Sequence, residues 1–351
     1  MEKLTFTLKQ HTPMLHFQHS QENATLRATE VKPRFDRWLI SKVWGNRFAD
    51  CKEYLIGYDA RFNADQLASF ERKFNEGFRA LNYKMRIECT GDRTSQVKME
   101  QITATKNGVP VTHKLLGSQL QTTSNYPSNK QSVIMSNIGG RLPEEVLNFT
   151  LYDSIKVIIH VSQQPLAGII KSKFEEFILS NNFGNRKSKG FGSFVMSDNN
   201  GSEIDEHFPA PWIMMTLKSK DGKTLNTDKA YKDIFMVINK IWRKLKSHCT
   251  DPDHKAKETV LLGQGIRRRL SRIPSPIIFK PVILAKEADS WKIAVELIYE
   301  KDVISKACEP HTENTYDGYI NELQDYLTDL DLDYFAQQVG LFYSLEKLTI
   351  E

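Results

Sequence analysis

A segment rich in glycine and cations lies near the middle of the chain, where residues 184–194 read GNRKSKGFGSF. Gly184, Gly190 and Gly192 permit positive φ angles and carry no side chain, so the backbone can turn tightly. In such a turn, backbone N–H groups can face phosphate oxygens while nearby cations neutralise their charge. The alternative is an ordinary surface connection whose cations are merely solvated. The segment completes neither a Walker A loop nor a dinucleotide-binding fingerprint, which argues against those two classes of nucleotide-binding site.

The patterns on either side of this segment predict a helix that leads into it and a strand that follows it. Apolar residues recur at helical spacing over residues 165–182, and residues 191–196 are typical of a strand. Phe191 and Phe194 are each able to stack on a base, but the more usual role of such residues is packing in the core of the domain.

The rest of the first half alternates between strand and helix patterns. Pro33 is suited to open a helix with Phe35, Trp38, Leu39 and Val43 on one side. Asn63 is suited to cap a second helix from residue 64 to about 81. Its apolar residues recur at helical spacing and are expected to pack in the core: Leu67, Phe70, Phe74 and Phe78. Strands are predicted at residues 4–8, 84–89, 97–105, 132–136 and 148–161, with an extended loop at 106–130.

The length of 351 residues exceeds the usual size of one domain, so two domains are expected. Residues 197–211 are rich in turn-forming residues and give the boundary. We therefore predict an N-terminal domain over 1–200 and a C-terminal domain over 201–351. The second is expected to contain strands at 212–218, 277–284 and 291–299 and a helix at 228–246.

Composition indicates an ordinary globular protein of the cytoplasm. The chain is 40% hydrophobic and 26% charged, and it has no apolar run of about 18 residues, so no membrane contact is expected. The N-terminus alternates like a strand rather than resembling a signal peptide. The cysteines are scattered without C-x-x-C spacing, so reduced thiols are expected: Cys51, Cys89, Cys249 and Cys308.

Charge is distributed unevenly along the chain. Residues 312–351 carry nine acids and one base, although the net charge of the whole chain is +5. A basic body suggests a partner that is a polyanion. The acidic C-terminal segment is expected to contain a helix, which either is simply solvated or packs on a neighbour.

Three motifs, in order, resemble the RAMP superfamily of CRISPR-associated proteins. The first comprises Thr12-Pro13-Met14-Leu15 and the stretch LRATEVKPRFDRW at 26–38, in which Pro33 stands where the family usually has glycine. The second is the basic segment, which resembles the family's glycine-rich loop. The third is Arg272-Ile273-Pro274-Ser275-Pro276. The most similar members are the two-domain, first-numbered RAMP subunits of type III-B effector complexes.

This resemblance implies an α+β fold of two ferredoxin-like, RRM-like domains that carry a glycine-rich basic loop. It also implies a non-catalytic subunit that grips the backbone of CRISPR RNA or target RNA beside other effector subunits. Base pairing would then read the sequence. No cofactor and no metal are expected. The candidate RNA-binding residues are Arg27, Lys32, Arg34, Arg37, Arg186, Lys187, Ser188, Lys189, Gly190, Gly192, Arg267, Arg268, Arg269 and Arg272.

Two other functions stay open at this point. A RAMP-type endoribonuclease that processes repeat RNA would need acid/base side chains, for which His16 and His19 are the candidates. A pure assembly factor would instead use its cations to contact other subunits. Residues 248–254 contain metal-competent side chains, but their Asp-Pro-Asp sequence is typical of a turn.

Overall fold

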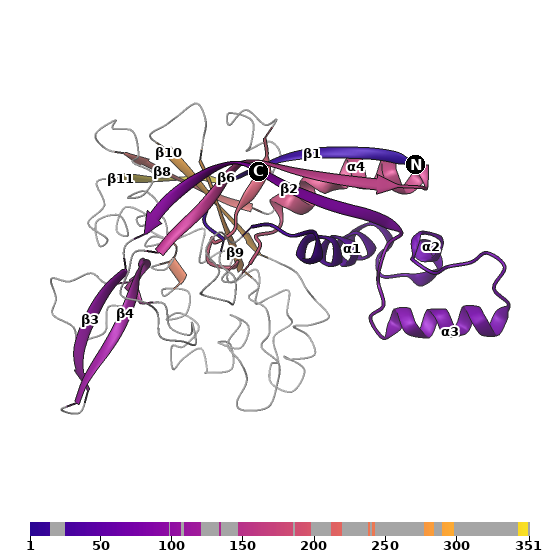
Figure 1. Cartoon of the computed structure of the whole chain (residues 1–351), viewed down its shortest axis with the longest axis horizontal. Coiled ribbons are helices and arrows are strands. Elements are labelled where there is room, and N and C mark those ends of the chain that lie inside the picture. Colours follow the sequence, from indigo (N-terminus) through magenta and orange to yellow (C-terminus); the bar gives the residue numbers. More distant parts are fainter. Residues whose placement is uncertain are drawn as a thin grey trace.

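The structure is a computed structural model of the chain (Figure 1). It describes residues 1–14, 25–97, 99–106, 109–120, 133–134, 147–184, 187–197, 212–219, 238, 241–242, 277–283, 290–297 and 343–349. Within this part it is a mixed fold of α-helices and antiparallel sheets. No helix among these residues is long and apolar enough to span a bilayer.

The first sheet has four strands in the order β2-β6-β1-β7. They are β1 (Glu2–Gln10), β2 (Tyr83–Val97), β6 (Leu147–Val161) and β7 (Phe194–Met196), and each pairs antiparallel with its neighbours. Helix α1 (Ala28–Trp44) lies between β1 and β2 in the chain, and α4 (Gln164–Leu179) lies between β6 and β7. The strands predicted at 4–8, 84–89 and 148–161 and the helix predicted at 165–182 are therefore confirmed.

Strict alternation gives this sheet one apolar face. Leu4 lies opposite Ile159, which lies opposite Met85, and the same face continues through β1 with Phe6 and Leu8. All of these except Met85 are buried. Alternate residues of a strand point to the same side, so these apolar side chains share one face of the sheet. Helices α1 and α4 cover that face with aromatic side chains.

The aromatic contacts join the two helices to the sheet. The ring of Phe174 in α4 stacks on Phe6 at 4.3 Å between centroids and meets Phe35 of α1 at 5.3 Å. Phe177 lies 4.8 Å from Phe35. Fully burying such side chains contributes roughly 1.5–3 kcal/mol each, so this cluster stabilises the packing of both helices on the first sheet.

Helix α1 begins earlier than the sequence predicts. It starts at Ala28 and has Pro33 in its interior, whereas Pro33 was expected to open it. Proline removes one helical hydrogen bond at this position. Val31 and Phe35 lie one turn apart on either side of it and are both fully buried. Their packing offsets the lost bond.

The region between α1 and β2 holds three short helical elements beside α1 (Figure 1): α2 (Phe48–Cys51), η1 (Lys52–Tyr54) and α3 (Ala64–Asn75). The predicted cap at Asn63 is confirmed, since its side chain accepts from Gln66 N at 2.9 Å. However, α3 ends at Asn75, before Gly77 at φ 108°. Phe78 therefore lies beyond the helix and is 45% exposed, so its prediction as a core residue is wrong.

A second, smaller sheet has the order β3-β4-β5. It comprises β3 (Met99–Lys106), β4 (Val109–Leu120) and β5 (Val133–Ile134). The extended loop predicted at 106–130 is wrong over β4, which pairs with β3 from Lys106 opposite Val109. Strand β4 accommodates Pro110 and Gly117, although each of these residues interrupts the sequence pattern of a strand.

The third sheet has four strands in the order β11-β8-β10-β9. They are β8 (Trp212–Ser219), β9 (Ile277–Ile283), β10 (Ser290–Leu297) and β11 (Tyr343–Thr349), all antiparallel to their neighbours. The three strands predicted in the second half are confirmed. Strand β11 lies at the end of the acidic tail and was not predicted, whereas the helix expected in that tail, at residues 319–335, lies outside the described residues. Within the predicted helix 228–246, residues 238 and 241–242 are helical, and the others lie outside the described residues.

Candidate nucleic-acid interface

The basic segment is a loop between α4 and β7 whose two ends are hydrogen-bonded to each other. Asn182 and Ser193 form an isolated bridge at its two ends, and Phe183 N donates to Gly192 O at 2.9 Å. Both ends are therefore pinned together. The cations Lys187 and Lys189 lie in the loop between these two ends.

Gly192 is required by close packing inside the chain. It has φ +65°, and a Cβ added there would lie 1.9 Å from the carbonyl oxygen of Phe183. Its own N–H donates to Pro13 O at 2.9 Å. No side chain larger than hydrogen fits this position without moving the backbone.

Gly190 is buried and is also held by neighbouring residues. Its carbonyl accepts from Thr12 Oγ1 at 2.7 Å, and a Cβ would lie 2.8 Å from Ile238 Cδ1 and 2.9 Å from Pro281 Cγ. Thr12 Oγ1 in turn accepts from Ser193 N at 2.9 Å. The N-terminal motif and the basic segment, far apart in sequence, thus form one structure.

The glycines do not form a phosphate cradle. The N–H of Gly184 donates to Glu30 Oε1 at 2.7 Å, that of Gly190 to Lys187 O at 3.4 Å, and that of Gly192 to Pro13 O at 2.9 Å. Each donor is satisfied within the chain. The N–H groups of Gly190 and Gly192, two residues predicted to contact RNA, are thus used within the chain to shape the turn.

The two aromatic residues of the segment belong to the core. Phe191 is 1% exposed, and Phe194 is fully buried and meets the ring of Phe183 at 5.8 Å between centroids. Neither ring is presented to solvent. Core packing, the more usual of the two roles considered for these residues, is therefore confirmed over base stacking.

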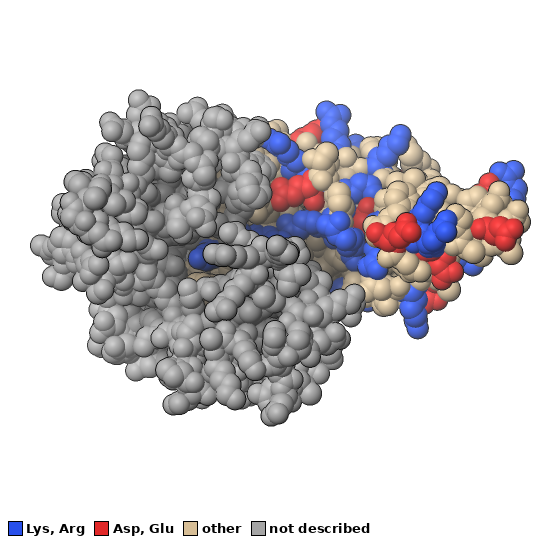
Figure 2. All heavy atoms as spheres, turned by 90° about the horizontal axis from the view of Figure 1, so that it is seen from below, with Lys and Arg blue, Asp and Glu red and all other residues tan. Residues whose placement is uncertain are grey.

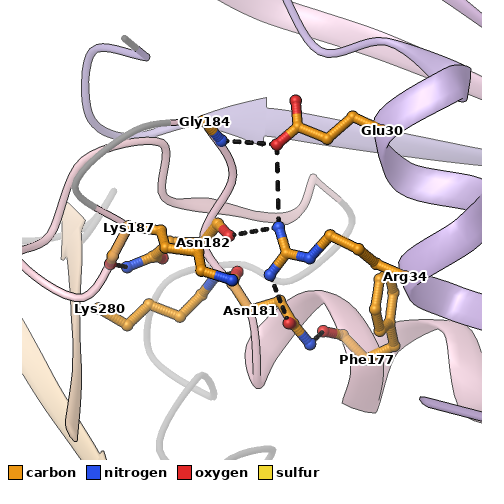
Figure 3. Close-up of polar contacts among 8 residues, drawn as sticks. All are labelled: Glu30, Arg34, Phe177, Asn181, Asn182, Gly184, Lys187 and Lys280. Carbon is orange, nitrogen blue, oxygen red and sulfur yellow. Dashed lines mark hydrogen bonds and ion pairs between the residues drawn. The ribbon is translucent and has the colours of Figure 1, made fainter. Parts of the chain in front are cut away.

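Arg34 braces the start of the basic segment (Figure 3). Its guanidinium donates from Nη1 to Asn182 O at 2.8 Å and from Nη2 to Asn181 Oδ1 at 2.7 Å, and it lies over the ring of Phe183 at 4.7 Å. The Glu30 carboxylate lies 3.9 Å from the same guanidinium. Arg34 was predicted to bind RNA, whereas these contacts give it a structural role.

Lys280 of β9 reaches the same point from the third sheet. It is fully buried, and its Nζ donates to Ile178 O and Asn181 O, both at 2.8 Å. Figure 3 shows Lys280 beside Asn181. These carbonyls lie at and just beyond the C-terminus of α4, where helical hydrogen bonds end and a positive charge is favoured. Lys280 thus caps α4 from another sheet.

Asn182 completes this arrangement. Its Nδ2 donates to Lys187 O at 2.7 Å and to Phe279 O at 2.6 Å, and Lys189 forms a parallel bridge with Phe279. The basic segment is therefore attached to β9. We call the set Glu30, Arg34, Asn181, Asn182 and Lys280 the α4 junction.

Lys32 also has a structural role. Its Nζ lies 2.6 Å from Asp36 Oδ2, donates to Leu81 O at 3.0 Å and sits 4.2 Å from the centre of the Tyr83 ring. Burial raises the pKa of Asp36, and the attraction of Lys32 opposes that rise. Lys32, a second predicted RNA-binding residue, is engaged in holding α1 to β2.

The remaining predicted residues of this region differ in their exposure. Arg27 and Arg37 are exposed, and no described side chain forms an ion pair with either. Lys187, Ser188 and Lys189 are half-buried, and Lys189 Nζ lies 5.6 Å from the ring of Trp242. A row of Lys and Arg side chains crosses the described part of the face seen in Figure 2.

Several predicted residues lie outside the described part of the chain, so their placement is not tested: His16, His19, Arg186, Arg267, Arg268, Arg269, Arg272 and the metal-competent residues 248–254. Among the described residues, no group of three His, Cys, Asp or Glu side chains is placed to hold a metal. Cys51 and Cys89 are free thiols.

Comparison with known proteins identifies the family. Residues 1–249 match the family model described as the Cmr1 N-terminal domain. The chain belongs to the Cmr1 family. This match covers more than two thirds of the 351 residues and confirms the resemblance to the first RAMP subunit of type III-B complexes. No curated protein sequence matches the chain.

Two solved structures are similar to this Cmr1-family chain. The crystal structure of apo Cmr1 from Pyrococcus furiosus is 10% identical, with 85% of this chain and 88% of that chain covered and a TM-score of 0.36. A chain in the cryo-EM structure of the type III-B Cmr-β complex bound to cognate target RNA is 12% identical, with a TM-score of 0.31. There the match covers 55% of this chain and 58% of the other.

Sequence reasoning missed the α4 junction. The sequence pattern places Asn181 and Asn182 only at the end of a helix, and Lys280 only within a strand. One signal was available, since a lysine inside the apolar run IIFKPVI needs a buried partner if that strand is in the core. The sequence does not say which carbonyls supply it.

Proposed function

We propose that this Cmr1-family chain is a non-catalytic RNA-binding subunit of a cytoplasmic type III-B CRISPR effector complex. Its partners would be other effector subunits and the guide or target RNA. Membership of the Cmr1 family supports the assignment to such a complex. The basic body of the chain supports a partner that is a polyanion.

The observation that carries the proposal is the fixed position of the basic segment. Arg34, Lys280 and Asn182 hold its base by six hydrogen bonds to main-chain and side-chain acceptors, and Thr12 holds its far end. Ordering of a loop on binding costs affinity, so a segment that is already held presents its cations at lower cost. Such a surface suits the phosphate backbone, which is the same for every sequence.

The proposed contacts change with the geometry. We retain Arg186, Lys187, Ser188 and Lys189 as RNA-binding residues. Arg27 directly precedes α1, one turn from Glu30, whose carboxylate accepts from Gly184 N, so Arg27 lies on the same side of the molecule. We also retain Arg37 and, from the second half, Arg267, Arg268, Arg269 and Arg272. Lys32, Arg34, Gly190 and Gly192 act by shaping and bracing this surface.

The architecture that we propose is two domains, 1–200 and 201–351. The element order β1-α1-β2-β6-α4-β7 and the strand order β2-β6-β1-β7 support a ferredoxin-like first domain with insertions. The separate sheet β11-β8-β10-β9, built only from residues after 211, supports a second domain.

The test is a combined assay of binding and cleavage with CRISPR-repeat RNA and an unrelated single strand. We expect the full chain to bind both RNAs without cutting either. The triple variant Arg186→Gln, Lys187→Gln, Lys189→Gln should lose most of this affinity. Cleavage that disappears in a His16→Ala, His19→Ala variant would replace our proposal with a processing endoribonuclease.

A further inference from the structure

The face of the first sheet that lies opposite α1 and α4 is cationic. Its residues alternate with the buried ones along each strand, so side chains at odd positions of β1 and even positions of β2 and β6 point away from the helices. The cations on this face come from three adjacent strands: Lys3 and Lys9 of β1, Lys84 and Arg86 of β2, and Lys156 of β6. We call these five residues the open-face cluster.

The register brings these cations close together. Lys3 lies opposite His160, which lies opposite Lys84, so two lysines and a histidine form one row across three strands. Two rows further along, Thr7 lies opposite Lys156, which lies opposite Glu88. Neighbouring strands are about 4.8 Å apart and rows on one face about 6.7 Å apart, so Lys3 and Lys84 lie about one Debye length apart, and Arg86, in the row between, lies within that length of both Lys84 and Lys156.

Few acidic side chains of the described residues compensate this charge. Glu88 is the acid of these rows, and it is engaged by Arg86, whose Nε lies 3.0 Å from its Oε1. Lys3, Lys84 and Lys156 are exposed, and no described residue forms a hydrogen bond or ion pair with their ammonium groups. Three cations are thus presented to solvent on a rigid sheet.

The residues on the face that carries the open-face cluster indicate which class of partner it binds. Lysine is depleted from the buried centres of protein–protein interfaces, which are instead rich in aromatic and apolar groups. The middle row offers Thr5, Ile158 and Arg86, so the planar groups of these three rows are the imidazole of His160 and the guanidinium of Arg86. Stacking of bases needs aromatic or guanidinium planes, so a face dominated by lysine favours phosphates over bases.

We propose that the open-face cluster is a second RNA-binding surface, separate from the basic segment, which contacts phosphates regardless of sequence. The polyanion is identified as RNA on the basis of the function proposed above, whereas the surface itself follows from the geometry. Its position on the side away from the helices means that the basic segment and the open face engage different stretches of a long RNA.

The test compares three variants of the full chain, each with three cations replaced by glutamine. The open-face variant carries Lys3→Gln, Lys84→Gln and Lys156→Gln. The segment variant carries Arg186→Gln, Lys187→Gln and Lys189→Gln. The control variant carries Arg72→Gln, Lys73→Gln and Lys171→Gln, which remove the same charge from exposed positions of α3 and α4. Thermal unfolding confirms that each variant is folded.

The readout is the affinity for a 40-nucleotide poly(U) and a 40-nucleotide poly(A) at two salt concentrations. Each phosphate contact with single-stranded RNA changes the slope of log K against log salt by about 0.7, so three lost contacts lower it by about 2. When the salt is raised from 50 to 200 mM, the factor by which RNA affinity falls should then be about 16 times smaller for the open-face variant than for the wild type. This difference should be the same for poly(U) and poly(A).

Each outcome decides the proposal. An open-face variant that behaves like the control overturns it, and so does a loss confined to one of the two RNAs. Unchanged RNA affinity with lost binding of poly-glutamate would assign the face to an acidic protein instead. If the segment variant behaves like the control while the open-face variant loses affinity, the function proposed for the basic segment fails and the second surface stands.

Discussion

Cations that look alike in the sequence have different roles at the residue scale. Lys32 and Arg34 lie beside Arg37 in one basic stretch, yet Lys32 pairs with Asp36 and Arg34 braces Asn181 and Asn182. Arg37 is exposed. Helical spacing could predict which of these residues share a face, but it could not reveal acceptors that lie 147 and 148 positions further along the chain.

The first prediction concerns Gly192. Replacement by alanine should destabilise the chain by more than about 3 kcal/mol, because backbone strain of roughly 1–3 kcal/mol for a residue with positive φ adds to a contact of 1.9 Å with Phe183 O. Gly45→Ala is the matched control, since its φ is +56° and a Cβ there would meet nothing within 4 Å. Chemical denaturation measures both. Equal losses would contradict the close packing described for Gly192.

The second prediction concerns the pH dependence that Asp36 causes. Burial raises its pKa above the ordinary value of 3.8, despite the opposing attraction of Lys32. When a carboxyl group has a higher pKa in the folded state than in the unfolded state, its protonation stabilises the fold. This stabilisation is fully present at pH values below the unfolded-state pKa and is lost as the pH rises through the folded-state pKa. The wild type should therefore gain stability relative to Asp36→Asn when the pH is lowered from about 7 to about 4.5. Urea denaturation of both proteins at the two pH values checks this, and a constant difference would count against it.

At the scale of elements, the sequence predicted the start of α3 better than its end. Asn63 caps this helix as expected, and Gln66, three residues further on, completes a capping box. The C-terminus of α4 is completed by Lys280, which lies 102 positions beyond its acceptor Ile178, so no local pattern contains it. Strand β4 was missed for a related reason, because its pairing with β3 outweighs the turn-forming residues within it.

The third prediction concerns this distant cap. Lys280→Met keeps a side chain of similar length but removes two charge-assisted hydrogen bonds, leaving the Ile178 and Asn181 carbonyls without their donor. The loss of stability should be about 2–4 kcal/mol, since hydrogen bonds to charged groups contribute roughly 1.5–3 kcal/mol each and partial relaxation recovers some of it. Lys171→Met, at an exposed position of α4, should change stability by less than about 0.5 kcal/mol. Thermal or urea unfolding distinguishes the two, and similar effects would argue against a role for Lys280 in capping.

At the scale of the whole molecule, the basic segment joins the first sheet to the third. Asn182, Lys189 and Lys280 carry the contacts with β9, and Thr12 ties the segment to the end of β1. The sequence predicted helices and strands in both halves and a tight turn at this segment. It assigned the glycines to a ligand, whereas their N–H groups donate within the chain, because a glycine pattern reports a tight turn without identifying what surrounds it.

The most direct test of the account is the salt dependence of RNA binding by the variant Arg186→Gln, Lys187→Gln, Lys189→Gln. If these cations contact phosphates, the slope of log K against log salt should fall by about 2 relative to the wild type. The control variant Arg72→Gln, Lys73→Gln, Lys171→Gln should leave the slope unchanged. A wild-type slope in the segment variant, with the protein still folded, would contradict the central claim that this segment grips the RNA backbone.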